Sequence, residues 1–139
     1  MNAKKIIITG AATRIGAAIA ESLAGYSTEI SIHYNKSKSN ALKLKNRLEN
    51  FGSEVHLLKA DLNNYKQTHN LLKLANKKMK GIDCLINNAS LFENDDLQNF
   101  SEKSFTKHIN INLKAPAILI QNFKKILKKS EGCIINIID

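Results

Sequence analysis

The sequence predicts an α/β protein built on a doubly wound parallel sheet. Short apolar runs bounded by turn residues alternate with longer segments of helical period, and the first run leads through a glycine-bearing turn directly into a helix. A chain of 139 residues can form one domain with a real core, because a chain of this size buries roughly two thirds of its unfolded surface. We therefore expect one Rossmann-like unit over residues 1–139.

The apolar runs place the strands, and the periodic segments between them place the helices. We expect strands at 4–9, 28–34, 54–59, 82–87 and 132–138, and helices at 14–25, 39–51, 64–79 and 103–129. Pro116 has no N–H to donate, so the last helical segment should kink or start afresh after Asn112. This order of units predicts the strand order 3-2-1-4-5, with ligands at the carboxyl ends of the strands.

The composition limits the classes of partner. The formal charge is +9, but 19 of the basic residues are lysines and only 2 are arginines, spread over several expected helix surfaces. This distribution favours a solvated lysine-rich surface over a nucleic-acid interface. The longest apolar run near the start, "IIITG", is too short for a signal sequence or a membrane span, so we expect a cytoplasmic protein without membrane contacts.

Cysteines and histidines give no pattern typical of metal binding. Cys84 and Cys133 each lie in an apolar strand-like run and are expected to be small buried side chains, not disulfide or metal partners. The four histidines form no HExxH pair. The sequence therefore predicts no metal site.

The stretch "IIITGAATRIG" predicts a phosphate-binding turn. Gly10 lets the chain turn tightly, Gly16 lets helix and strand approach closely, and the helix that opens at Arg14 and Ile15 offers unpaired N–H groups to a pyrophosphate. A simple tight turn remains the alternative at this point.

The spacing Thr9-Gly10-x-x-x-Arg14-x-Gly16 resembles the fingerprint of the short-chain dehydrogenase/reductase family, with Arg14 where most members have a second glycine. Three further segments, "KADL", "INNAS" and "INLKAP", fall in register with the same family. The resemblance implies cofactor contacts near the adenine and the nicotinamide, and a catalytic asparagine that helps to hold a water and a lysine. The residues concerned are Asp61 and Leu62 for the adenine, Asn88, Ala89 and Ser90 after the fourth strand, and Asn112 as the catalytic asparagine.

The end of the second strand predicts which nicotinamide cofactor fits. A carboxylate there would accept the ribose 2′-OH of NAD, whereas cations accommodate the 2′-phosphate of NADP. The segment contains no carboxylate, so we expect NADPH, bound with the help of Arg14 and held by His33, Tyr34, Asn35, Lys36 and Ser37. An ordinary solvated lysine loop is the alternative.

Arg14, "HYNKS" and "NNASLF" resemble the pteridine reductase branch of the family, and so does Asp139, which stands where most members carry a catalytic serine. The resemblance implies reduction of a pterin C=N bond by hydride transfer. The implied substrate-binding residues are Arg14, Ser90, Phe92 and Asp139, with Asp139 also assisting the proton transfer. A core or lid role is the alternative for Phe92.

In the resembled family a tyrosine and a lysine four residues later complete the catalytic group, and they are expected beyond Asp139. We therefore expect this chain to be the amino-terminal, cofactor-binding part of the enzyme and inefficient alone. Open alternatives are a 3-oxoacyl-type carbonyl reductase and an inactive dinucleotide-binding remnant. The resemblance also implies a dimer or tetramer formed through the helix after Asn112.

Overall fold

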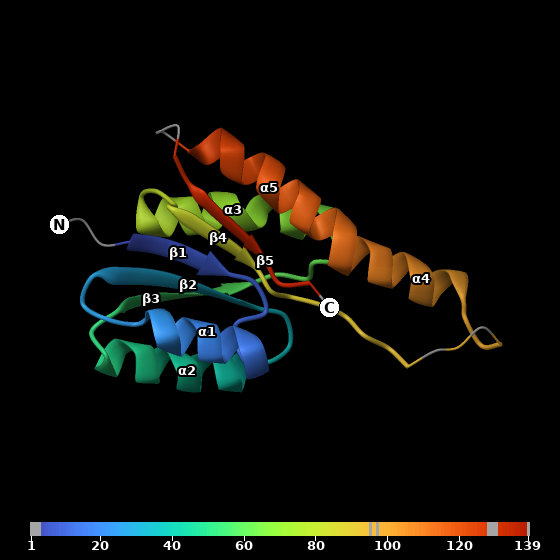
Figure 1. The fold of residues 1–139 in the computed structure, drawn as a ribbon, viewed down its shortest axis with the longest axis horizontal. Helices are drawn as coiled ribbons and strands as arrows, with labels where there is room; N and C mark the ends of the chain where they lie inside the picture. Colours follow the sequence, from blue (N-terminus) through green and yellow to red (C-terminus); the bar gives the residue numbers. More distant parts are fainter. Residues whose placement is uncertain (1–3, 95, 97, 128–130, 139) are drawn as a thin grey trace.

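A five-stranded parallel sheet forms the centre of the molecule. The computed structural model describes residues 4–94, 96, 98–127 and 131–138. The strands are β1 (Lys4–Ile8), β2 (Thr28–Tyr34), β3 (Glu54–Lys59), β4 (Cys84–Asn87) and β5 (Cys133–Asn136). They lie in the order β3-β2-β1-β4-β5, which confirms the predicted doubly wound topology (Figure 1).

Helices cover both faces of this sheet. α1 (Arg14–Leu23) and α2 (Lys38–Asn50) lie on one face, and α3 (Tyr65–Met79) and α5 (Ala115–Ile126) lie on the other (Figure 1). α4 (Glu102–Ile109) extends beyond the sheet and has no buried residue. The loops that follow β1, β2, β3 and β4 therefore meet at one end of the sheet, where a doubly wound fold binds its ligand.

Two apolar layers hold the helices on the sheet. Alternate residues of a strand point to opposite faces, so Ile6 and Ile8 of β1 pack toward α1 and α2, whereas Ile7 packs toward α3 and α5. Small residues at Ala17 and Ala20 let α1 lie close to the strands. The central strands, buried on both sides, place the glycine-bearing turn on a rigid base.

Local sequence signals set the bounds of α3. Asn64 caps its start, because its side chain accepts a hydrogen bond from the backbone N–H of Gln67 over 3.1 Å. At the other end Lys80 adopts a left-handed conformation with φ 55°, and Gly81 follows with φ 143°. These two residues turn the chain back into β4.

The expected single helix over 103–129 is divided. α4 and α5 are separated by a π-helical turn over Asn110–Lys114, in which the N–H of Ala115 donates to the carbonyl of Asn110. Pro116, in the first turn of α5, has no N–H to donate to the carbonyl of Asn112. The predicted break after Asn112 is therefore confirmed, and residues 128–130 lie outside the described residues.

The prediction for the two cysteines is wrong in part. Cys84 and Cys133 are register partners in neighbouring strands, and Cys133 is exposed while Cys84 is half-buried. The pKa of the Cys84 thiol is raised to about 12, mainly because the thiol is partly buried and secondly because it shares a hydrogen bond with Cys133. The sequence pattern could not indicate this pairing, because it depends on the register of β4 and β5.

The outer strand β5 is exposed along its whole length, with Ile134 at 40% and Ile135 at 42% of full exposure. These two residues point to opposite faces, so both faces of the strand are open in the described part of the chain.

No helix in the described part of the chain is long and apolar enough to span a bilayer.

Candidate functional site

A cavity of about 380 Å³ opens at the carboxyl ends of β1, β2, β3 and β4. Most of the predicted cofactor-binding residues line it, and so do several residues from the neighbouring loops and from the end of β5. The lining comprises Gly10, Thr13, Arg14, Ile15, Gly16, His33, Asn35, Asp61, Leu62, Asn88, Ala89, Ser90, Leu91, Ile111, Ile137 and Ile138.

The turn after β1 requires its glycines. Gly10 has φ 62°, a conformation that L side chains rarely adopt, and a Cβ atom there would lie 2.9 Å from the Cα of Ala89. A Cβ atom at Gly16 would lie 2.5 Å from Nδ2 of Asn88 and 2.6 Å from the carbonyl oxygen of Gly10. The glycines thus let the turn, the first turn of α1 and the loop after β4 come into contact.

Thr9 and Asn88 join the first and fourth strands beneath this turn. The hydroxyl oxygen of Thr9 accepts hydrogen bonds from the backbone N–H groups of Asn88 and Ala89, each over 3.0 Å. In return the Asn88 side chain donates to the carbonyl oxygens of Thr9, over 2.9 Å, and Gly10, over 3.2 Å. Asn88 therefore holds the glycine-bearing turn from the side opposite to His33.

His33 supports the turn from the second strand. The backbone N–H of Gly10 donates to Nδ1 of His33 over 3.0 Å, so Nδ1 carries no proton. The proton of the neutral ring is then on Nε2, which donates to the carbonyl of Ala60 over 3.1 Å. Burial lowers the pKa of His33 to about 4, which keeps the ring neutral at physiological pH.

Arg14 adopts an uncommon backbone conformation, with φ 53° at the first position of α1. Glycine is the residue that tolerates this region at no steric cost, which gives a physical reason for the glycine expected in most members of the resembled family. The arginine brings a positive charge to the rim of the cavity, and its backbone carries the strain.

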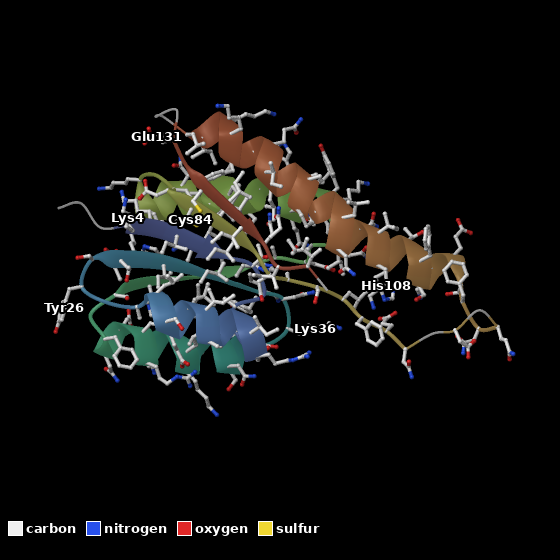
Figure 2. All side chains as sticks on the ribbon, in the orientation of Figure 1. Lys4, Tyr26, Lys36, Cys84, His108 and Glu131 are labelled. Carbon is white, nitrogen blue, oxygen red and sulfur yellow. The ribbon has the colours of Figure 1, made fainter. Side chains whose placement is uncertain are left out.

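The predicted residues at the end of β2 occupy different environments. Asn35 lines the cavity together with His33, whereas Tyr34 is 8% exposed and belongs to the core beneath α1 and α2. Lys36, labelled in Figure 2, and Ser37 are exposed on the loop before α2, and neither residue lines the cavity. In this conformation Lys36 and Ser37 could meet only a ligand that extends beyond the cavity.

Asp61 and Leu62 line the cavity from the loop that follows β3. The backbone N–H of Asp61 donates to Oε1 of Gln67 over 2.7 Å, and a carboxylate oxygen of Asp61 accepts from the N–H of Asn63 over 2.9 Å. These bonds fix the loop between β3 and α3 and leave Asp61 and Leu62 facing the cavity.

Asn112 holds the loop after β4. Its Oδ1 accepts from the N–H of Leu91 and its Nδ2 donates to the carbonyl of Leu91, each over 2.8 Å. Asn112 lies in the π-helical turn, a feature often found at functional sites. Asn112 does not line the cavity in this structure, and its two bonds place Ser90 and Leu91 there instead.

The proposed substrate residues are only partly brought together. Arg14 and Ser90 line the cavity, while the ring of Phe92 is 80% exposed on the loop beyond Leu91. Ile137 and Ile138 carry the end of the fifth strand to the cavity. Asp139 itself lies outside the described residues.

Thr9 belongs to the candidate site, although the sequence did not single it out. In the sequence it is only one position of the fingerprint, yet its hydroxyl joins two strands at the base of the cavity. A hydroxyl at a strand end, directly before the turn glycine, was the available signal. Thr13, Leu91 and Ile111 also line the cavity and had no signal beyond their position.

Comparisons with known proteins agree with this architecture. Residues 4–138 match the family model described as short chain dehydrogenase. The FolM alternative dihydrofolate reductase 1 of Brucella suis, crystallised with NADP, is 34% identical, with a TM-score of 0.89 over 96% of this chain and 56% of that chain. A short chain dehydrogenase of Burkholderia cenocepacia, also crystallised with NADP, is 27% identical, with a TM-score of 0.91 over 97% of this chain and 55% of that chain.

Among curated proteins, the 3-oxoacyl-[acyl-carrier-protein] reductase FabG of Rickettsia prowazekii is 34% identical over 143 residues, which cover 99% of this chain and 54% of that protein. The chain spans about half the length of the curated relatives it matches.

Proposed function

The chain belongs to the short-chain dehydrogenase family, and from this premise we propose that it is the cofactor-binding part of an NADPH-dependent reductase that acts on a pterin. Different residues support the choice of cofactor and the choice of substrate. The residues that line the cavity support the choice of NADPH, called the cofactor step, and the residues at its rim support the choice of a pterin, called the pterin step.

The observation that carries the cofactor step is the charge at the end of β2. The segment from His33 to Ser37 contains no carboxylate, and Arg14 and Asn35 line the cavity beside it. A carboxylate would favour the free ribose hydroxyl of NAD, whereas this positive rim favours the 2′-phosphate of NADP. Similar proteins crystallised with NADP or NADPH support the same choice.

The remaining contacts of the cofactor follow from the geometry of the turn. The N-terminus of α1 directs unpaired N–H groups toward the cavity, where they suit a pyrophosphate. Asp61 and Leu62 would then hold the adenine end, and Asn88, Ala89 and Ser90 the nicotinamide end. Hydride transfer is the chemistry that this cofactor supplies.

The pterin step is supported by Arg14, Ser90 and Phe92, and by the identity of Asp139. Phe92 directly follows the lining residues Ser90 and Leu91, and its exposed ring would offer a stacking surface for a flat heterocycle. Reduction of a C=N bond adds a hydride to carbon and a proton to nitrogen, and a carboxyl group can help to deliver that proton. The 34% identity to an alternative dihydrofolate reductase favours this substrate class.

A second candidate substrate is a carbonyl group of the 3-oxoacyl type. The 34% identity to the Rickettsia reductase favours it. Asp139 argues against it, because a serine at that position would donate a hydrogen bond to a ketone oxygen more simply than a carboxylate can. The two candidates share the cofactor and differ at the rim.

We also propose that the complete protein self-associates. α4 carries the half-exposed Phe105 and Ile109, and Leu113 follows in the π-helical turn at 64% exposure. Rows of exposed apolar side chains on neighbouring helical turns are typical of protein interfaces. Sedimentation of the protein encoded by the gene would test this proposal.

The experiment that tests the function uses the protein as its gene encodes it. We expect NADPH-dependent reduction of a dihydropterin to be faster than reduction of a simple ketone, and Asp139→Ser to lower kcat for the pterin by about two decades or more. NADPH affinity should stay unchanged in that variant. A preference for the ketone, or full pterin activity of Asp139→Ser, would contradict the pterin step and leave the NADPH step standing.

A further inference from the structure

A group of polar side chains lies on the sheet away from the cofactor cavity. We propose that Glu29, Glu54 and His56 form a binding site for one divalent transition-metal ion of the zinc class. The three side chains come from the amino-terminal halves of β2 and β3, whereas the cavity opens at the carboxyl ends. This proposal does not depend on the proposed function.

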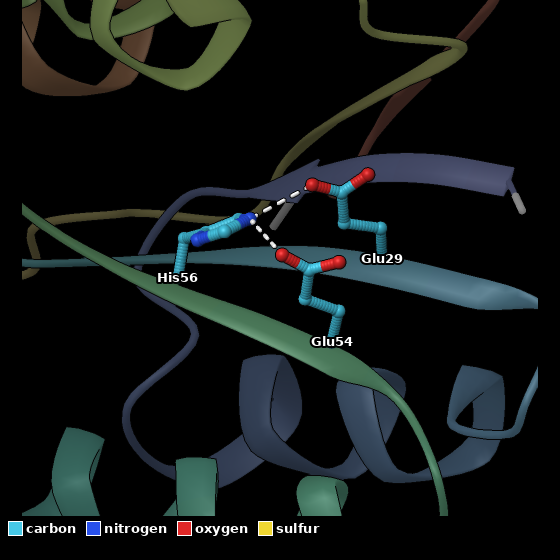
Figure 3. A group of neighbouring side chains, drawn as sticks. All are labelled: Glu29, Glu54 and His56. Carbon is cyan, nitrogen blue, oxygen red and sulfur yellow. Dashed lines mark hydrogen bonds and ion pairs between the residues drawn. The ribbon is translucent and has the colours of Figure 1, made fainter. Parts of the chain in front are cut away.

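The register of two parallel strands brings the three ligand atoms together. Glu29 pairs with Glu54 and Ser31 pairs with His56, so these residues form a square on one face of the sheet. One ligand atom from each of Glu29, Glu54 and His56 lies within 4.8 Å of the others. Figure 3 shows the three side chains pointing to the same side, away from α1 and α2.

The distances suit a cation between the ligands. Nε2 of His56 lies 2.8 Å from Oε1 of Glu29 and 3.6 Å from Oε1 of Glu54. Zinc binds nitrogen and carboxylate oxygen at roughly 2.0–2.2 Å, so small side-chain movements would bring all three atoms into its coordination shell. The free protein keeps these positions through the hydrogen bond between His56 and Glu29.

The charges also favour a cation. The Glu29 side chain is only 10% exposed, and a second carboxylate lies near it. A buried carboxylate needs a compensating charge, and a cation bound between the two carboxylates would supply it. Lys5 is the register partner of Glu29 on β1, but its ammonium donates to the carbonyl of Lys80 over 3.3 Å.

A second, independent observation points to a ligand here. Ser31 is fully buried, and within the described residues its hydroxyl has no hydrogen-bond partner. Its side chain lies on the same face of the sheet, directly across from His56. An unsatisfied buried hydroxyl needs an explanation, and a water bound to a metal ion at this square would provide its partner.

The ligand set identifies the class of ion. One imidazole nitrogen with two carboxylates suits Zn²⁺ or Co²⁺, whereas Mg²⁺ and Ca²⁺ prefer oxygen alone. Sequence spacing could not predict this site, because Glu29 is far from Glu54 and His56 in the chain and meets them only through the β2–β3 pairing.

The test is a calorimetric titration of the metal-free chain with Zn²⁺, repeated with Co²⁺ and followed by its visible spectrum. We expect one saturable site. Loss of a residue that contacts only a metal ligand typically weakens metal affinity roughly tenfold to hundredfold. His56→Gln and Glu29→Gln should each weaken Zn²⁺ affinity by more than this, whereas Ser31→Ala should weaken it by about tenfold. Circular dichroism establishes that each variant is folded.

Two controls make the result specific. His69→Gln replaces a histidine on α3 outside the square and should leave the affinity unchanged, and the double variant Cys84→Ser, Cys133→Ser removes the thiols that could compete for zinc. Loss of binding in the cysteine variant alone would overturn the proposal. Absence of saturable binding, or binding that His56→Gln does not weaken, would show a hydrogen-bonded pair only.

Discussion

The backbone N–H of Gly10 donates a hydrogen bond of 3.0 Å to Nδ1 of His33, so the glycine-bearing turn after β1 is held by a side chain of β2. The same ring reaches the carbonyl of Ala60 after β3. A protonated Nδ1 could not accept from Gly10, which links the geometry of the turn to the charge of His33.

The first prediction is that acid weakens the fold through His33. Burial lowers its pKa from 6.5 to about 4, so between these values the unfolded chain binds a proton that the folded chain does not. The part of the free energy of unfolding that depends on neutral His33 is fully present above pH 6.5. It is lost as the pH falls, by about 2 kcal/mol between pH 7 and pH 5. Urea unfolding at both pH values measures it. The change should be smaller in His33→Gln, and an equal change would contradict the assignment.

The second prediction concerns the contact between α1 and the loop after β4. Gly16→Ala would place a Cβ atom 2.5 Å from Nδ2 of Asn88, which must then move and release the turn. We expect a loss of roughly 1–3 kcal/mol in the free energy of unfolding and weaker NADPH binding. Gly25→Ala is the matched control, because a Cβ atom there meets nothing within 4 Å. Equal effects of the two substitutions would argue against the close approach.

The third prediction separates strain from charge at Arg14. Arg14→Gly relieves a left-handed backbone that costs a residue with a side chain on the order of 1–2 kcal/mol, so stability should hold or rise slightly. NADPH affinity should fall about tenfold or more, because a charge-assisted hydrogen bond is lost. Arg14→Ala keeps the strain and should lose affinity without the gain in stability. Thermal melting and fluorescence titration measure the two effects.

The fourth prediction tests cofactor choice beyond the cavity. The unmutated protein should bind NADPH at least about tenfold more tightly than NADH, the gain expected from one charge-assisted bond to the 2′-phosphate. Lys36→Asp should erase or reverse this preference, whereas Lys43→Asp on the exposed side of α2 should not. Equal dissociation constants of the unmutated protein for the two cofactors would refute the NADPH assignment.

The fifth prediction concerns Phe92. Its ring is 80% exposed, so Phe92→Ala should cost little stability. In the protein encoded by the gene it should weaken pterin binding roughly threefold to tenfold through lost stacking, and leave NADPH affinity unchanged. Phe51→Ala, at the end of α2 and 57% exposed, is the control for loss of a surface ring. Unchanged pterin affinity in Phe92→Ala would support a lid or packing role instead.

The predictions made from sequence succeeded where the physical signal is local. Short apolar runs predicted all five strands, although β4 and β5 are shorter than expected, and the positions of Gly10 and Gly16 predicted the turn that lines the cavity. Pro116 predicted the break before α5, because a missing N–H acts within one helical turn. The lack of a carboxylate after β2 could likewise be read from the sequence, because it does not depend on which residues meet in the fold.

The sequence by itself therefore determined the class of fold, the glycine-bearing turn and the absence of a carboxylate after the second strand. Only the tertiary structure decided that His33 and Asn88 hold that turn, that Tyr34 points into the core, and that Glu29 meets His56. The physical reason is that helix periodicity, turn geometry and formal charge belong to neighbouring residues. Which side chain meets another across the sheet depends instead on strand order, register and face, and these are set by the packing of the whole chain.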